Sequence, residues 1–188
     1  MILKVIRFNI KNSSKKLKNF LDKRKYIQKN QTTIVSKIIN NVRRNGDKAV
    51  LNYEKKFSKI KTKSTKIFFT TSELNKISNK LDPKIKKSID LAYNRIKKFH
   101  QKQKFESFSF KDKYKNVLSY KYSSLEKVGV YVPGGTASYP STVLMNCIPA
   151  IVAGVKNIYL ATPSLDSKIN PAIVYAAKKC GVKKIYKT

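Results

Sequence analysis

The chain has 188 residues, of which 41% are hydrophobic, and this is enough for one domain with a buried core. Its 42 basic and 10 acidic residues give a formal net charge of +32, which favours contact with polyanions. The composition excludes a disulfide-stabilised scaffold, because there are only two cysteines, and a helix that crosses a bilayer, because no apolar run approaches the roughly 20 residues that such a helix needs.

The first residues, Met-Ile-Leu-Lys-Val-Ile, form too short an apolar run, too soon followed by charge, for a secretory signal peptide. We therefore expect a reducing, cytoplasmic setting. Cys147 and Cys180 both lie in apolar stretches of predicted helices. They are interpreted as small buried thiols.

The net charge leaves a polyanion-binding domain open as an alternative function. The lysines, however, are spread along the whole chain and alternate with Asn, Ile and Ser, which is typical of a drift in composition. Base recognition relies on the planar fork of arginine, and no nucleic-acid recognition motif accompanies the charge. The arginines are Arg7, Arg24, Arg43, Arg44 and Arg95.

Residues 1–104 are predicted to form a mainly helical region. Apolar residues recur at helical spacing through residues 33–53. The pair Asn45-Gly46 interrupts this pattern, so we expect it to end one helix, after which Asp47 caps the next.

Two further helices are predicted in this front region, after a short strand pattern at residues 66–70. Thr71 or Ser72 is expected to cap the first of them, which runs to residue 81. Asp82 and Pro83 then give a cap followed by a proline at the first helical position, which predicts a helix to about residue 103. The apolar face of that helix consists of Ile85, Ile89, Ala92, Ile96 and Phe99.

Residues 105–127 are predicted to form short antiparallel or linking strands. From residue 105 to residue 122 the spacing of apolar residues changes to two, with Phe108 and Phe110 alternating with polar residues. Residues 117, 118, 120 and 122 continue the strand-like pattern.

From residue 128 onward Gly, Pro, Ala and Val replace the background of Lys and Asn. Residues 128–132 form a continuous apolar run, as expected of a strand that is covered on both faces. Residues 142–154 have a helical pattern that Gly154 ends, and Pro149 within it is expected to kink or split the helix.

The same region continues with a second strand, a helix and a third strand. Residues 157–161 form the second strand, Asn170 and Pro171 begin the helix, Gly181 ends it, and the third strand begins at Lys183. This order predicts an α/β fold in which a β-α-β-α-β unit with parallel strands and right-handed crossovers begins a Rossmann-like domain that is incomplete at residue 188.

The turn after the first of these strands is the candidate binding site. Ligands of parallel sheets bind beyond the carboxyl ends of the strands, where residues 131–136 are expected to lie. Gly134 and Gly135 allow a close approach of the backbone, and free amide groups there can receive an anion. The sequence Tyr-Val-Pro-Gly-Gly-Thr matches neither GxGxxG nor the phosphate loop, so a tight turn without a ligand is an equal alternative.

Several segments taken together resemble histidinol dehydrogenase. The densest likeness follows residue 128, and a looser likeness begins near residue 30. The segments are Val128-Gly-Val-Tyr-Val-Pro-Gly-Gly-Thr-Ala137, Tyr139-Pro-Ser-Thr-Val-Leu-Met145, Ile148-Pro-Ala-Ile-Val-Ala-Gly154, Ile169-Asn-Pro-Ala172, Gly181-Val182, Arg43-Arg-Asn-Gly-Asp-Lys-Ala-Val50 with Tyr53 and Phe57, and Ile96-Lys-Lys-Phe-His-Gln-Lys-Gln103.

This resemblance implies an oxidoreductase of histidine biosynthesis. The family oxidises L-histidinol to L-histidine in two NAD-dependent steps, with one zinc ion in each active site, and works as a homodimer. Tyr131 matches the tyrosine with which the family contacts NAD. It is the only site residue that the resemblance assigns to this chain.

The resemblance also implies that the zinc ligands and the general bases of the family would follow residue 188. We therefore expect an N-terminal fragment without catalytic or metal-binding residues and without dehydrogenase activity of its own. A non-catalytic domain that docks on a partner stays an alternative. His100, in the family's Phe-His-x-x-Gln pattern, is interpreted as structural, and Ser141 as a helix cap in preference to a residue of the substrate pocket.

Overall fold

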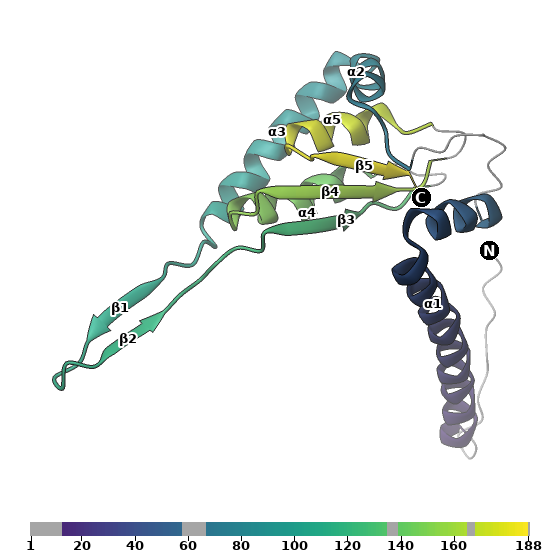
Figure 1. Cartoon of the computed structure of the whole chain (residues 1–188), viewed down its shortest axis with the longest axis horizontal. Coiled ribbons are helices and arrows are strands. Elements are labelled where there is room, and N and C mark those ends of the chain that lie inside the picture. The colour runs from purple at the N-terminus through teal and green to yellow at the C-terminus, as the bar shows by residue number, and fades with distance from the viewer. Residues whose placement is uncertain (1–12, 58–66, 135–138, 165–167, 188) are drawn as a thin grey trace. The chain divides into compact units, whose positions relative to one another are not determined.

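The computed structural model describes residues 13–57, 67–134, 139–164 and 168–187. It divides into two compact units, Met1–Asn52 and Tyr53–Thr188, which are described separately (Figure 1). The predicted fold class is confirmed, because helices precede a small parallel sheet. None of the helices in the described ranges is long and apolar enough to span a membrane.

Helix α1, Ser13–Phe57, consists of two helices joined at Gly46. Gly46 has φ 53° and ψ −140°, a conformation that a residue without a Cβ atom adopts without strain. The predicted interruption at the Asn-Gly pair is therefore confirmed. The capping role of Asp47 stays a prediction.

Helix α2, Thr71–Asn79, begins with a capping box. The Thr70 amide donates to Glu73 Oε2 at 2.6 Å, and the Glu73 amide donates to Thr70 Oγ1 at 3.3 Å. The predicted cap at Thr71 or Ser72 is therefore wrong, because this reciprocal bonding requires the cap to stand three residues before the glutamate. Of the strand predicted at residues 66–70, the described part forms a single antiparallel bridge, between Phe68 and Tyr186.

Helix α3, Pro83–Gln101, begins as predicted, with Asp82 Oδ1 accepting from the Lys84 amide at 2.6 Å. The middle of its apolar face is buried against the core, where Ile89 is 5% exposed. The ends of that face are exposed at Ile85 and Phe99. Tertiary packing thus uses only the central turns of the predicted apolar face.

Two short strands form an antiparallel hairpin, as predicted. Strand β1, Phe108–Lys111, pairs with β2, Val117–Tyr120, so that Phe108 lies opposite Tyr120 and Lys111 opposite Val117. The hairpin makes a sheet separate from the parallel one (Figure 1).

The parallel sheet contains β3, Lys127–Tyr131, β4, Asn157–Thr162, and β5, Lys184–Lys187, in the order β3-β4-β5. Helix α4, Pro140–Val152, connects β3 to β4, and helix α5, Pro171–Lys179, connects β4 to β5. The predicted β-α-β-α-β unit with parallel strands is therefore confirmed. The handedness of its crossovers stays a prediction.

One face of this sheet is buried by helices. Val132, Leu160 and Ile185 on that face are at most 1% exposed and belong to one core with residues of α4 and α5. The helices α3, α4 and α5 also pack on one another, which places them in a single layer. The expectation that β3 is covered on both faces is therefore wrong, because burial alternates along β3 and Tyr131 on the other face is exposed.

Helix α4 begins at Pro140, two residues before the predicted start, because proline favours the first helical position. Pro149 lies inside the helix and does not split it. Gly154 and Gly181 have φ values of 96° and 68°, so both end their helices as predicted. Asn170 caps α5, with its Oδ1 accepting from the Ala172 amide at 2.8 Å.

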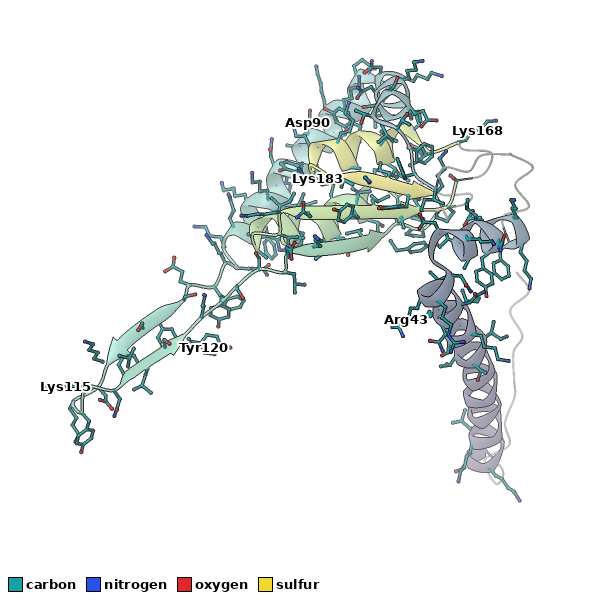
Figure 2. All side chains as sticks on the ribbon, in the orientation of Figure 1. Arg43, Asp90, Lys115, Tyr120, Lys168 and Lys183 are labelled. Atoms are coloured by element: carbon teal, nitrogen blue, oxygen red, sulfur yellow. The ribbon has the colours of Figure 1, made fainter. Side chains whose placement is uncertain are left out.

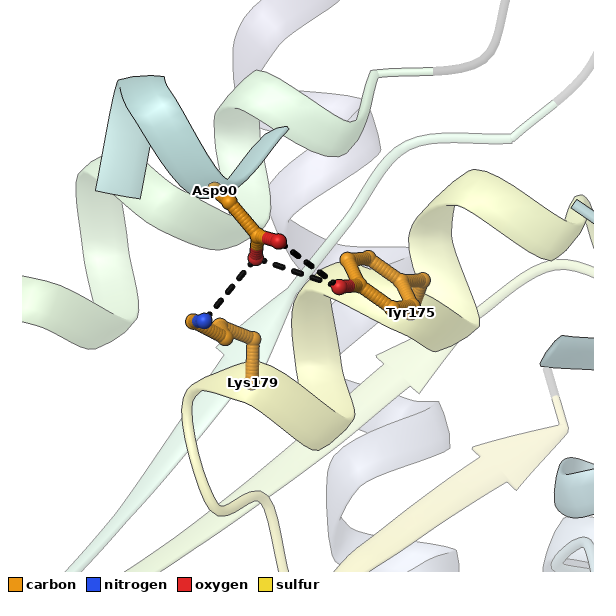
Figure 3. A network of polar contacts seen from close by, with 3 residues as sticks. All are labelled: Asp90, Tyr175 and Lys179. Atoms are coloured by element: carbon orange, nitrogen blue, oxygen red, sulfur yellow. Dashed lines mark hydrogen bonds and ion pairs between the residues drawn. The ribbon is translucent and has the colours of Figure 1, made fainter. Parts of the chain in front are cut away.

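Asp90 of α3 joins this helix to α5 (Figure 3). Its Oδ1 accepts from Lys179 Nζ at 2.9 Å, and Tyr175 Oη donates to Oδ2 at 3.0 Å. The hydrogen bond from Lys179 holds the pKa of Asp90 below its usual value, and the bond to Asp90 raises the pKa of Lys179. Burial and the bond to Asp90 raise the pKa of Tyr175.

We expect Asp90→Asn to destabilise the chain more at pH 6 than at pH 3. A carboxylate whose folded pKa is lowered stabilises the fold above its ordinary value of about 3.8, and this contribution is lost as the pH falls through the lower folded value. The difference should be small, since Asp90 and Lys179 are partly exposed. Urea unfolding of the unchanged chain and of Asp90→Asn at the two pH values measures the loss in free energy of unfolding. A loss that is the same at pH 6 and at pH 3 contradicts the lowered pKa of Asp90.

Candidate functional site

The carboxyl ends of β3 and β4 lie side by side and form the carboxyl edge of the sheet. Tyr131 is opposite Ala161 in the register, and the Val132 amide donates to the Ala161 carbonyl at 2.9 Å. Two turns leave this edge, one through Pro133 and Gly134 and the other through Pro163 and Ser164. Parallel sheets bind their ligands here.

Tyr131 presents an exposed side chain at this edge. Val132, the next residue, is fully buried in the core, while 61% of Tyr131 is exposed. Because successive side chains of a strand point to opposite faces, burial of Val132 directs Tyr131 away from the core. The phenol ring is therefore available for stacking and hydrogen bonding with a ligand.

Gly134 brings the two turns into contact. A Cβ atom added to Gly134 would lie 3.0 Å from Pro163 Cβ and 3.1 Å from the Pro163 carbonyl oxygen. The absence of a side chain at Gly134 thus serves packing between the turns, whereas the sequence suggested close approach to a ligand. Gly135 and Thr136, also part of the predicted turn, lie outside the described residues.

Two hydroxyl residues at the end of β4 were not predicted as site residues. Thr162 is 1% exposed and Ser164 is 2% exposed. Within the described ranges, Ser164 Oγ is buried and has no hydrogen-bond partner. A buried hydroxyl without a partner costs about 1–3 kcal/mol, which makes it a candidate for bonding to a polar ligand group. The only sequence signal was a serine in the turn after a strand.

The two cysteines are buried, as predicted, and form no disulfide. Cys147 lies within α4, and Cys180 follows the last residue of α5. A hydrogen bond with Cys147, together with burial, raises the pKa of Cys180. Cys180 therefore stays protonated near neutral pH, so the interpretation of this thiol as structural agrees with its surroundings.

Neither His100 nor Ser141 belongs to a group of metal ligands within the described part of the chain. His100 Nδ1 is 2.6 Å from Gln103 Oε1, one turn further along the chain. Among the residues that the structure describes, no three His, Cys, Asp or Glu side chains are grouped so as to hold a metal ion. Ser141 is not the cap of α4, since that position belongs to Tyr139, which makes no side-chain capping bond.

An open groove of about 940 Å³ lies at the opposite edge of the sheet, where β3 begins. Its lining includes Val128 at the start of β3, Pro149 and Val152 of α4, and Phe105 and Tyr122 at the base of the hairpin. His100 also borders it. Because the groove is at the amino ends of the strands, it is not the place where a parallel sheet binds its ligand.

Comparison with known proteins identifies one family. Residues 21–188 match the family model described as histidinol dehydrogenase. The chain is 50% identical over 186 residues to a histidinol dehydrogenase of Pelagibacter ubique, covering 98% of the chain and 42% of that protein. It is 37% identical over 168 residues to a histidinol dehydrogenase of Brucella abortus, covering 89% of the chain and 39% of that protein.

A solved structure gives the same result for the fold. The crystal structure of histidinol dehydrogenase from Elizabethkingia anophelis superposes on the chain with a TM-score of 0.76 at 36% identity. This match covers 84% of the chain and 36% of the solved one. The chain therefore spans about two fifths of the length of the relatives that it matches.

Proposed function

The chain belongs to the histidinol dehydrogenase family, and we propose that it is part of an enzyme that oxidises L-histidinol to L-histidine in two NAD-dependent steps. The observation that supports this most directly is the exposed Tyr131 at the carboxyl edge of a parallel sheet, the edge at which dinucleotides bind. The alternative of a basic domain that binds polyanions is not favoured, since the similarity to these enzymes covers 98% of the chain.

In this proposal the nucleotide-binding part corresponds to residues 128–188, after a helical part at 1–104 and linking strands at 105–127. NAD, when bound, accepts the hydride from the alcohol carbon of the substrate. The role of this chain is to hold and orient the cofactor. Tyr131 contacts it from the end of β3, and the buried hydroxyl of Ser164 is close enough in the fold to border the same edge.

The zinc ion that the family uses does not fit the described residues, which contain no group of three possible ligands. No catalytic step is therefore assigned to a metal on this part of the chain. The expectation that the chain has no dehydrogenase activity by itself stays a prediction. A homodimeric enzyme and a cytoplasmic location are further parts of the proposal, and the resemblance to the family supports both.

We expect Tyr131→Ala to weaken NAD binding by about tenfold, which corresponds to about 1.4 kcal/mol, because the substitution removes the stacking surface of the phenol ring. Calorimetric titration of the 188-residue chain with NAD measures the dissociation constant. Tyr114→Ala is the matched control, since Tyr114 is 72% exposed in the turn of the hairpin. Absence of NAD binding, or equal weakening by the two substitutions, would contradict the proposed contact.

A further inference from the structure

Ser164 has a buried hydroxyl group whose hydrogen-bonding capacity the folded chain does not use. The residue is 2% exposed, and among the buried side-chain oxygen and nitrogen atoms of the described ranges only Ser164 Oγ has no hydrogen-bond partner. Buried hydroxyl groups are nearly always bonded, because an unmade bond leaves the cost of desolvation uncompensated. This hydroxyl is therefore a candidate contact for an atom of a ligand.

The alternation of burial along β4 places Ser164 on the face of the sheet that the helices cover. Leu160 and Thr162 face the core and are at most 1% exposed, and Ser164 continues the same alternation beyond the end of the strand. Helices α4 and α5 cover this face, and they begin at Pro140 and Pro171, after the carboxyl ends of β3 and β4. Ser164 therefore lies at the carboxyl edge, on the side of the helices.

The residue before Ser164 contacts the turn that follows β3. A Cβ atom added to Gly134 would lie 3.0 Å from Pro163 Cβ, so the turns after β3 and β4 touch each other. Tyr131 is the last residue of β3, three residues before Gly134. Tyr131 and Ser164 thus border one edge from adjacent strands, Tyr131 on the exposed face of the sheet and Ser164 on the covered face.

An exposed lysine lies at the same edge. Lys168 precedes the cap of α5, and Figure 2 shows it on the side where the strands end, with Lys183 on the opposite side, before β5. A cation at this edge attracts the phosphates of any nucleotide and does not distinguish one nucleotide from another. Selection among nucleotides requires a polar group in a fixed position, and the buried hydroxyl of Ser164 is such a group.

The order of the elements indicates which part of a dinucleotide this hydroxyl meets. In dinucleotide-binding folds, a residue that follows the second strand bonds the 2′-hydroxyl of the adenosine ribose. Here β3, α4 and β4 correspond to the first strand, its helix and the second strand, and Ser164 follows the second strand. A serine hydroxyl both donates and accepts, as a ribose hydroxyl does, so the two groups can bond in either direction.

We propose that Ser164 Oγ bonds the 2′-hydroxyl of the adenosine ribose of NAD. The inference rests on the proposed function and adds to it a residue that selects the adenosine half of the cofactor. Because the hydroxyl is enclosed in the free chain, Ser164 has to shift when the ribose binds. This shift breaks no hydrogen bond of the hydroxyl, and the bond to the ribose satisfies it.

Calorimetric titration with NAD and with an NAD analogue that lacks this 2′-hydroxyl tests the contact. We expect Ser164→Ala to weaken NAD binding about tenfold, and the unchanged chain to bind the analogue about tenfold more weakly than NAD. The analogue should bind the unchanged chain and Ser164→Ala equally, because each change removes the same bond. If Ser164→Ala weakens binding of the analogue as much as it weakens binding of NAD, the inference is overturned.

Thermal unfolding without ligand gives a second, independent measurement. Ser164→Ala should leave Tm unchanged or raise it, because the substitution removes a buried polar group that makes no bond in the free chain. A lower Tm would reveal a structural partner of the hydroxyl and overturn the inference. Ser119→Ala is the matched control, since Ser119 is exposed in β2 and should affect neither NAD binding nor Tm.

The same titrations separate this inference from the proposed function. If the unchanged chain binds no NAD, the proposed function and the inference are both wrong. If the unchanged chain binds NAD and Ser164→Ala binds it equally well, only the inference is wrong.

Discussion

Replacing Leu160 by alanine is expected to lower the free energy of unfolding by about 2–5 kcal/mol, the usual cost of removing a buried leucine side chain. Leu160 lies in the middle of β4, the central strand, and is fully buried. It belongs to the core in which residues of α4 and α5 pack on the sheet. The loss should be large because the cavity would lie between the sheet and the helices α4 and α5, which cannot easily move together to fill it.

Leu91→Ala is the control for this substitution. Leu91 lies in α3 and is 60% exposed, so the same change of side chain should alter the free energy of unfolding by less than about 0.5 kcal/mol. Chemical denaturation followed by circular dichroism gives both values. Similar losses for Leu160→Ala and Leu91→Ala would contradict the placement of Leu160 in the core.

Replacing Gly134 by alanine is expected to destabilise the chain by about 1–3 kcal/mol, as overpacking at a filled site commonly does. The added Cβ atom would meet Pro163 Cβ at 3.0 Å and the Pro163 carbonyl oxygen at 3.1 Å. These atoms belong to a proline ring and to the backbone, so neither moves away easily. The turns after β3 and β4 must separate, which also displaces Tyr131 from its position at the carboxyl edge.

Gly129→Ala separates this effect from the general effect of removing a glycine. Gly129 lies in β3, and an added Cβ atom there would have no heavy atom within 4 Å. Alanine at this position should be neutral or slightly stabilising, because it reduces the freedom of the unfolded chain. Thermal unfolding of the two variants compares them, and a loss for Gly129→Ala as large as for Gly134→Ala would rule out the contact with Pro163 as the cause.

Local signals in the sequence predicted most of the elements. Asp82 with Pro83 and Asn170 with Pro171 each specify a helix start through bonds to nearby residues, and both starts were predicted correctly. The break in α1 at Gly46 was also predicted correctly, because it depends only on the backbone conformation of that one residue. The cap of α2 was assigned to Thr71 or Ser72 and lies at Thr70; the spacing of three residues between Thr70 and Glu73, which is the signature of a capping box, was the sequence signal that selects Thr70.

Properties that depend on tertiary packing were predicted less well. The run Val-Gly-Val-Tyr-Val favours a strand covered on both faces, but the helices lie together in one layer and leave Tyr131 exposed. The strand predicted at residues 66–70 is reduced in its described part to one bridge, since its partner is Tyr186 at the far end of the chain. Sequence spacing alone contains no information on such distant pairs.

In the candidate site, too, features set by local sequence signals were predicted and features set by tertiary packing were not. The position of Tyr131 at the end of a parallel strand followed from the order of the elements. The contact of Gly134 with Pro163 and the burial of Ser164 join turns that are about thirty residues apart, so they emerge only from the folded chain. Tyr131 itself as an NAD contact stays a prediction from the family resemblance.

The short bridge at Phe68 also protects the sheet from unwanted pairing. The Phe69 amide donates to the Ile185 carbonyl at 3.0 Å, and the Lys187 amide donates to the Ile67 carbonyl at 2.8 Å. These bonds occupy backbone groups on the outer side of β5, which would otherwise be a template for a strand of another molecule. A segment that is made before α2 thus closes the border of a strand that is made much later, and newly made chains become resistant to edge-to-edge aggregation at β5 only once both are in place.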